Sequence, residues 1–293
     1  PKRLNRLPPM TLIYVTLDLR RALYIPQATG AVILCSYQSD LLPILRKKGY
    51  HVFCFEEVYP REKAPTSSAE LIGSGKSLQF LKSLNDDLRF LVFKPSNKVR
   101  RLVESQGWTL VSSDVKVCRI LEDKLEFPKL AEKHGIRIPR YEIHPWNKAD
   151  ISAYRERFGD SFLVQSRIGH AGSSTWVIKA DTQDGPSKRG GILSKMPVKI
   201  SQFIFGPTYT LNGYASPKGK LVFGPVFEQL MHVPSWNEYV MGTIGISPSS
   251  LSHEVLTHLR EMLMKLSPLF QELGFYGFFG VDLIFDGKEW VMI

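Results

Sequence analysis

A single carboxylate lies in the apolar stretch that ends the chain. Asp282 stands between Val281 and Leu283 in the segment 274–293, GFYGFFGVDLIFDGKEWVMI. Burying a carboxylate among such neighbours is costly unless it binds a metal ion, a cation or backbone donors. Asp282 is therefore a candidate metal ligand, and a carboxylate on an exposed strand face is the alternative interpretation.

A glycine-serine segment is the second group with chemical potential. Residues 169–175, GHAGSST, lie between two strand-like runs and include Gly169, Gly172, Ser173 and Ser174. Backbone N–H groups that converge in such a turn can cradle a phosphate. An ordinary hairpin loop would have the same composition, so this alternative stays open.

Two lysine-containing segments could also bind phosphate. Lys124 lies in LEDKLEF, which we expect to be helical, and a solvated surface lysine is the alternative. The segment 73–77, GSGKS, is similar to the end of a P-loop. A P-loop requires a glycine at the position of Glu70, and no apolar strand precedes it. We interpret 73–77 as a loop that enters a helix.

Other catalytic patterns are missing from the sequence. The seven histidines are dispersed and form no HExxH or HxH pair, and there is no GxSxG elbow. The three cysteines, Cys35, Cys54 and Cys118, are odd in number and lie in apolar or helical contexts. We expect reduced thiols and a cytoplasmic protein.

The composition favours an anionic partner. The formal net charge is +10 and the pI is about 9.4, which suits nucleotides, acidic metabolites or nucleic acid. The basic residues are scattered without interleaved aromatics, which argues against a dedicated nucleic-acid binder. No uncharged apolar run is long enough for a membrane span. The segment 11–21, TLIYVTLDLRR, is interrupted by Asp18 and lacks a cleavage site, which argues against a signal peptide.

The first part of the chain alternates strands and helices. Residues 31–36 are a buried-strand run, 39–48 have helical spacing, and HVFCFEE reads as a strand. The pattern repeats with a strand at 89–93, a helix at 96–106 and a strand at 108–112. Such repeats predict a parallel sheet with helices, so we expect an N-terminal α/β domain over 1–112.

The rest of the chain predicts an α+β domain over 113–293. A helical and lid part extends to about 198, and an antiparallel α+β part covers about 199–293. The expected elements are a helical stretch ending at Gly135, a strand at 141–144, a helix at 149–158, strands at 198–204, 208–215 and 220–227, and a helix at 251–273. Asp286-Gly287 predicts a tight hairpin turn within 274–293. Because the chain stops in an apolar strand, we expect it to be the front portion of a longer protein.

Taken in order, these features resemble the ATP-grasp superfamily, in its carboxylate–amine ligase branch. The resemblance covers about 31–293 and implies a Rossmann-like pre-ATP-grasp domain before an ATP-grasp fold, with ATP and Mg²⁺ as cofactors. Lys124, ahead of Gly135-Ile-Arg-Ile-Pro139, matches a lysine that contacts ATP phosphates. The strand position where the family commonly has a second lysine is Gln165, and the loop from Gly169 to Thr175 matches the lid.

The resemblance also assigns the adenine and metal sites. The adenine segment corresponds to Ser201, Gln202, Phe203 and Ile204, although Ser201 and Thr208 replace the two usual glutamates. Asp282 matches the first metal carboxylate. The second carboxylate would begin directly after the last residue, Ile293.

The resemblance implies formation of an amide or peptide-like bond through an acyl phosphate, with release of ADP and phosphate. Small-molecule carboxylate and amine substrates are implied, and Glu228, Gln229 and Tyr239 are candidates to contact them. A non-catalytic ATP-binding module with a degenerate site is the main alternative, and a nucleic-acid-associated protein is the third. The sequence leaves open the substrates and whether the chain forms a homo-oligomer.

Overall fold

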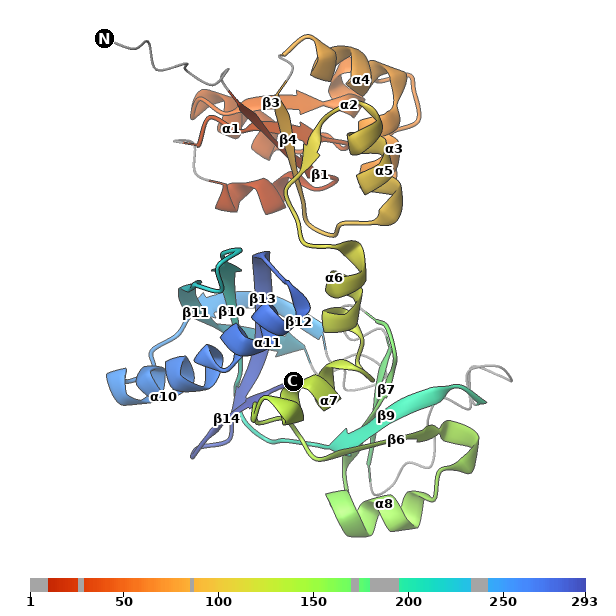
Figure 1. The fold of residues 1–293 in the computed structure, drawn as a ribbon, viewed down its shortest axis with the longest axis vertical. Coiled ribbons are helices and arrows are strands. Elements are labelled where there is room, and N and C mark those ends of the chain that lie inside the picture. Colours follow the sequence, from red (N-terminus) through yellow and green to blue (C-terminus); the bar gives the residue numbers. More distant parts are fainter. Residues whose placement is uncertain (1–9, 26–28, 85–86, 170–173, 180–194, 233–241) are drawn as a thin grey trace. The chain divides into compact units, whose positions relative to one another are not determined.

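The computed structural model describes residues 10–25, 29–84, 87–169, 174–179, 195–232 and 242–293. The chain divides into two compact units, Pro1–Val115 and Lys116–Ile293. Both units combine helices and strands (Figure 1). Among the described residues, no helix has the length and apolar character needed to cross a membrane.

The first unit is built on a five-stranded parallel sheet in the order β3-β2-β1-β4-β5. The strands are β3 (His51–Cys54), β2 (Val32–Cys35), β1 (Thr11–Thr16), β4 (Leu88–Val92) and β5 (Thr109–Leu110). The helices are η1 (Leu19–Tyr24), α1 (Leu41–Lys47), α2 (Phe55–Val58), α3 (Ser68–Gly73), α4 (Gly75–Lys82) and α5 (Asn97–Ser105). This confirms the predicted α/β class.

Both faces of this sheet are covered. Ile13 and Val15 of β1 pack with the core formed by α3, α4 and α5, whereas Tyr14 faces the core formed by η1 and α1. A parallel strand buried on both faces reads as a continuous apolar run. The apolar run 11–16, which is not among the strands predicted from the sequence, has this character and forms the central strand β1.

Two local predictions in this unit have different outcomes. The loop 73–77 does enter a helix, because the Ser74 hydroxyl accepts a hydrogen bond from the Ser77 N–H and caps α4. The predicted strand HVFCFEE ends earlier, at Cys54, where α2 begins at Phe55.

The second unit contains two antiparallel sheets. The four-stranded sheet has the order β6-β9-β7-β8 and the five-stranded sheet the order β12-β11-β10-β13-β14. The strands are β6 (Tyr141–Pro145), β7 (Phe162–Ser166), β8 (Thr175–Ile178), β9 (Pro197–Gln202), β10 (Thr208–Ala215), β11 (Leu221–His232), β12 (Gly242–Pro248), β13 (Gly277–Phe285) and β14 (Trp290–Met292). The predicted antiparallel α+β character is therefore confirmed.

Helices cover one face of each sheet. The helix α8 (Ile151–Phe158), which follows the short η3 (Trp146–Lys148), packs on the four-stranded sheet through Tyr154 and Phe158. The helices α6 (Val115–Glu122), α7 (Phe127–Lys133), α10 (His253–Met264) and α11 (Leu266–Leu273) contribute to the core of the five-stranded sheet.

Three predicted elements differ in detail. The single helix expected at 251–273 is two helices, because Pro268 has no N–H to donate to Met264, where α10 ends. The predicted hairpin is present, but its connection is the four-residue loop 286–289. The Asp286 carboxylate accepts hydrogen bonds from the N–H groups of Lys288 and Glu289, which stabilises the longer turn.

The helical stretch ending at Gly135 is also interrupted. The helix α6 ends at Glu122, and α7 begins at Phe127 with Pro128 in its first turn. Lys124 was predicted to lie on a helix, but it lies in the turn between these two helices. In this turn the Lys124 side chain does not have to follow the surface of a helix, so it can point in another direction.

Candidate active site

A cavity of about 230 Å³ in the second unit brings together residues from both sheets. Its polar side chains include Lys124 from the α6–α7 turn, Gln165 from β7, Lys199 from β9 and Asp282 from β13. Apolar residues of α11, β13 and β14 line other parts of it. Three of the sequence candidates, Lys124, Gln165 and Asp282, therefore share one cavity.

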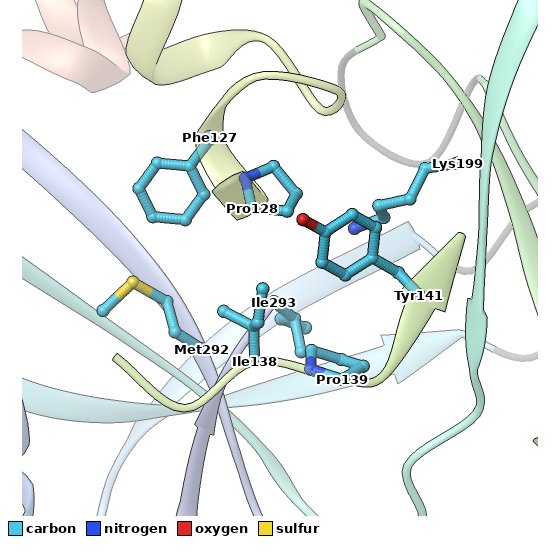
Figure 2. Close-up of a pocket in the computed structure, with 8 residues that line it drawn as sticks. All are labelled: Phe127, Pro128, Ile138, Pro139, Tyr141, Lys199, Met292 and Ile293. Carbon is cyan, nitrogen blue, oxygen red and sulfur yellow. The ribbon is translucent and has the colours of Figure 1, made fainter. Parts of the chain in front are cut away.

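A smaller adjoining cavity extends from the same region (Figure 2). Phe127, Pro128, Lys199, Met292 and Ile293 line both cavities. The additional lining residues are Ile138, Pro139 and Tyr141. The polar region around Lys199 thus continues into a mostly apolar one.

Asp123 holds the turn that carries Lys124. Its carboxylate accepts hydrogen bonds from the N–H groups of Leu125 (2.9 Å) and Glu126 (3.3 Å) and forms an ion pair with Arg167 (2.8 Å). The Lys124 N–H donates to the Arg167 carbonyl at 2.9 Å. These bonds tie the turn to the end of β7. The sequence reasoning did not single out Asp123 or Arg167.

We expect Asp123→Ala to lower the free energy of unfolding by about 1–2 kcal/mol, because two N–H groups and a guanidinium lose their acceptor. The looser turn should also weaken nucleotide binding through Lys124. Chemical denaturation and calorimetric titration with Mg-ATP measure the two effects. Asp123→Asn is the matched control, since its amide oxygen can still accept from the turn. Equal losses in both variants would contradict a role in shaping the turn.

Lys199 is a buried amine that the sequence reasoning missed. Only 8% of the residue is exposed, and within the described residues no hydrogen-bond or ion-pair partner is found for its amine. Burial is the main cause that lowers the pKa of Lys199 to about 8, and the charge of Lys124 adds to it. The available signal was a lysine between Val198 and Ile200 in a strand, which is the same kind of signal that marked Asp282.

The lowered pKa of Lys199 predicts that the free energy of unfolding depends on pH. Its pKa is about 8 in the folded protein and near the ordinary 10.5 in the unfolded chain. Between these values the unfolded chain binds more protons, so the free energy of unfolding rises with pH and the gain is lost as pH falls through 8. We expect the difference between wild type and Lys199→Met to change by about 3 kcal/mol at most across this window. Urea denaturation of both proteins near pH 8 and near pH 10.5 tests this prediction. A difference in the free energy of unfolding that does not change with pH would contradict it.

Asp282 faces the cavity from β13. Its carboxylate accepts a hydrogen bond from the Gln229 amide at 2.7 Å. It remains accessible to water through the cavity, yet the surrounding protein is dense enough for burial to raise its pKa. Hydrogen bonds from Thr210 and Gln229 and the charge of Lys124 lower the pKa by less than burial raises it. The hydrogen bonds and the charge of Lys124 therefore do not fully offset the cost that burial imposes on the ionised Asp282 carboxylate.

The donor set near Asp282 fits a magnesium ion that draws most of its ligands from elsewhere. No group of three or more His, Cys, Asp or Glu residues in the described part of the chain could hold a metal by itself. Magnesium uses one or two carboxylates and completes its shell with water and phosphate oxygens. Asp282 can supply such a carboxylate.

Lys124 faces an electrostatic environment similar to that of Lys199. Burial lowers the pKa of Lys124, and the nearby Asp282 carboxylate partly offsets this effect. Gln165 donates from its amide to the Thr175 hydroxyl at 3.1 Å. That bond joins β7 to β8 beside the predicted lid loop.

The structure describes the two ends of the predicted lid loop, Gly169 and Ser174. The Ser166 N–H donates to the Ser174 carbonyl at 3.0 Å. A Cβ atom at Gly169 would collide with the Ser174 side chain, so the close approach requires glycine there. Gly172 and Ser173 lie outside the described residues.

The predicted adenine segment is only partly extended. The strand β9 ends at Gln202, earlier than the predicted 204, and the Gln202 N–H donates to the Arg140 carbonyl at 2.9 Å. The Gln202 N–H is therefore used within the fold, while Phe203 and Ile204 lie just beyond the end of the strand. Ser201 is buried, and its hydroxyl lacks a partner within the part of the chain that the structure describes.

The substrate candidates separate onto two faces of β11. Gln229 reaches Asp282, whereas Glu228 is paired with Tyr209, which belongs to the core on the helix-covered face. Successive strand residues point to opposite faces, so Glu228 points away from Asp282. Tyr239 lies outside the described residues.

Solved structures share this architecture at low sequence identity. Phosphoribosylamine–glycine ligase from Thermotoga maritima superposes with a TM-score of 0.62 and 16% identity, covering 97% of this chain and 68% of that one. N5-carboxyaminoimidazole synthetase from Staphylococcus aureus, complexed with ADP, gives 0.61 and 14%, covering 97% and 69%. D-alanine–D-alanine ligase from Bacillus anthracis, complexed with ATP, gives 0.56 and 13%, covering 97% and 85%.

Sequence comparison finds two much longer relatives. The arginine-specific large chain of mitochondrial carbamoyl phosphate synthase from Schizosaccharomyces pombe is 26% identical over 185 residues, which are 62% of this chain and 16% of the relative. The carbamoyl phosphate synthase large chain from Sulfolobus acidocaldarius is 26% identical over 192 residues, or 64% and 17%. No family model matches the chain. The structural likeness confirms the predicted fold, an α/β domain followed by an ATP-grasp fold.

Proposed function

We propose that this chain belongs to an ATP-dependent carboxylate–amine ligase that forms a C–N bond through an acyl phosphate. The observation that carries the proposal is the shared cavity of Lys124 and Asp282, which is lined by a half-buried lysine and a carboxylate that stays accessible to water. The surrounding protein shifts the pKa of each group against its charged form. The three structural neighbours described above are ligases or synthetases by name, and two of them hold ADP or ATP.

The charges in the cavity suit a bound magnesium–polyphosphate. Phosphoryl transfer depends mainly on positioning and on neutralising phosphate charge. Lys124 would contact phosphate oxygens, and Asp282 would hold Mg²⁺, which supplies charge stabilisation at the transferring phosphate. Gln165 and the loop that begins at Gly169 would complete the phosphate site, while Phe203 and Ile204 would face the adenine.

The proposed reaction has two balanced steps. A carboxylate oxygen of the acid substrate attacks the γ-phosphorus, the bond to the β-phosphate oxygen breaks, and ADP leaves. The amine nitrogen then attacks the acyl carbon, the C–O bond to phosphate breaks, and the nitrogen loses a proton. Water must be excluded while the acyl phosphate exists, which is the task of a closing lid.

Gln229 would act on the substrate side by orienting the Asp282 carboxylate. Its 2.7 Å hydrogen bond to Asp282 supports this position. Glu228 is the weaker candidate because it lies on the other face of β11. The proposal also places the protein in the cytoplasm, where the free thiols of Cys35 and Cys54 would remain reduced.

Product release by the full-length protein tests the proposal. The protein is incubated with Mg-ATP and pools of amino acids and small carboxylic acids, and ADP, AMP and phosphate are measured. Substrate-dependent ADP and phosphate are expected, whereas AMP would contradict an acyl-phosphate mechanism. Tight ATP binding without product from any pool would favour the non-catalytic module.

A further inference from the structure

We propose that Lys199 on β9 is a second phosphate-binding residue of this site, and that it provides from the neighbouring strand the positive charge that Gln165 lacks. The inference rests on the proposed function, because it assumes that the cavity binds a polyphosphate. It assigns a role to a residue that neither the sequence motifs nor the expected ligands include.

Strand register places Lys199 beside Gln165. The two residues are direct partners in the antiparallel β7–β9 ladder. Directly opposed residues project from the same face of a sheet. The adjacent pair Val164 and Ile200 lies in the core with α8, so Lys199 and Gln165 face the other side, where both line the cavity.

The surroundings of the Lys199 amine point to an anionic ligand. A structural buried lysine would have an acceptor, yet within the described residues none is found within hydrogen-bonding distance. The hydroxyl of Tyr141, which lines the smaller cavity together with Lys199 (Figure 2), donates to Glu132 at 2.9 Å. The charged group that acts most on Lys199 is another cation, Lys124. Two cations held at one cavity without a shared acceptor are stabilised when an anion binds between them.

A lysine on β9 can replace one at position 165 of β7, because phosphate binding depends on where the positive charge lies and not on the strand that carries it. Side chains of direct cross-strand partners begin about 4.5–5.5 Å apart. A lysine side chain is long and flexible, so its ammonium can reach the same phosphate from either strand. The geometry therefore predicts that exchanging Gln165 and Lys199 preserves the site.

The test compares binding of Mg-ATP and of inorganic tripolyphosphate to the full-length protein by calorimetry. Lys199→Met should weaken both ligands about 10- to 100-fold, as expected for the loss of a charged hydrogen bond. The exchanged variant, Gln165→Lys with Lys199→Gln, should recover most of the affinity. Lys148→Met, at an exposed lysine of η3, is the matched control and should bind like wild type.

A second readout separates ligand binding from a structural role. Lys199→Met should unfold at the same or a higher temperature than wild type without ligand at pH 7, because it removes a buried charge. A lower melting temperature with unchanged ligand affinity would overturn the inference in favour of a structural lysine.

The outcomes also separate this inference from the proposed function. If wild type binds Mg-ATP and Lys199→Met binds it equally well, the role of Lys199 is wrong and the ligase proposal stands. If wild type binds tripolyphosphate through Lys199 but not Mg-ATP, the anion site stands and the ligase proposal fails. If wild type binds neither ligand, both fail.

Discussion

Replacing Asp282 by asparagine should reduce substrate-dependent ADP release about a hundredfold or more while the protein stays folded. A metal ion at a transferring phosphate contributes several kcal/mol to the stability of the transition state, and each 1.4 kcal/mol is a factor of ten in rate. Asparagine keeps the size of the side chain but loses the charge that attracts Mg²⁺. Steady-state assays over a range of Mg²⁺ concentrations measure the effect.

The same substitution should not destabilise the protein near neutral pH. Burial raises the pKa of Asp282 in the folded state, so this residue adds to stability below its unfolded pKa and the contribution is lost as pH rises through the folded pKa. Near neutral pH the raised pKa of Asp282 means that the folded state is penalised relative to the unfolded chain, and asparagine removes that penalty. Asp160→Asn, at an exposed position, is the control. Wild-type activity in Asp282→Asn would exclude the metal role.

Lys124→Met should raise the Kd for Mg-ATP more than tenfold, because a charged phosphate contact is worth about 1.5–3 kcal/mol. Burial lowers the pKa of Lys124, so the ionised amine is also unfavourable in the folded protein without ligand. Methionine retains the apolar stem and removes the charge. We therefore expect weaker nucleotide binding together with equal or greater stability, measured by calorimetry and thermal denaturation.

Lys129→Met is the matched comparison for Lys124. Lys129 is exposed on α7 and pairs with Glu126 at 3.1 Å, and exposed ion pairs contribute about 1 kcal/mol or less. It should bind Mg-ATP like wild type. Equal losses in the two variants would indicate a general effect of basic charge rather than a phosphate contact at Lys124.

The most secure predictions from sequence concerned elements whose pattern is local. The parallel sheet of the first unit, the strand 208–215 and the final hairpin follow from apolar runs, alternation and turn residues. The failures occurred where a local signal was ambiguous. The central strand β1 was not among the predicted strands, and Pro268 divides a helix that periodicity alone left continuous.

The candidate site residues also divide into those with a local sequence signal and those that only the packing brings together. Asp282 could be identified from sequence because a carboxylate in an apolar strand is conspicuous whatever its partners. Lys124 could be identified only through resemblance, and its place in a turn depends on Asp123 and Arg167, which meet from different elements. Lys199 had a signal of the same kind as Asp282, but no motif drew attention to it.

The sequence by itself determined most element types and the fold class, and it supplied a few candidate phosphate-binding residues, because periodicity and residue chemistry are properties of short segments. Only the tertiary structure decided which charges act together. The register of β7 against β9 places Lys199 beside Gln165, and the turn after α6 brings Lys124 to the cavity that Asp282 faces. Electrostatic coupling depends on distance and burial, and both are set by packing between segments far apart in the chain.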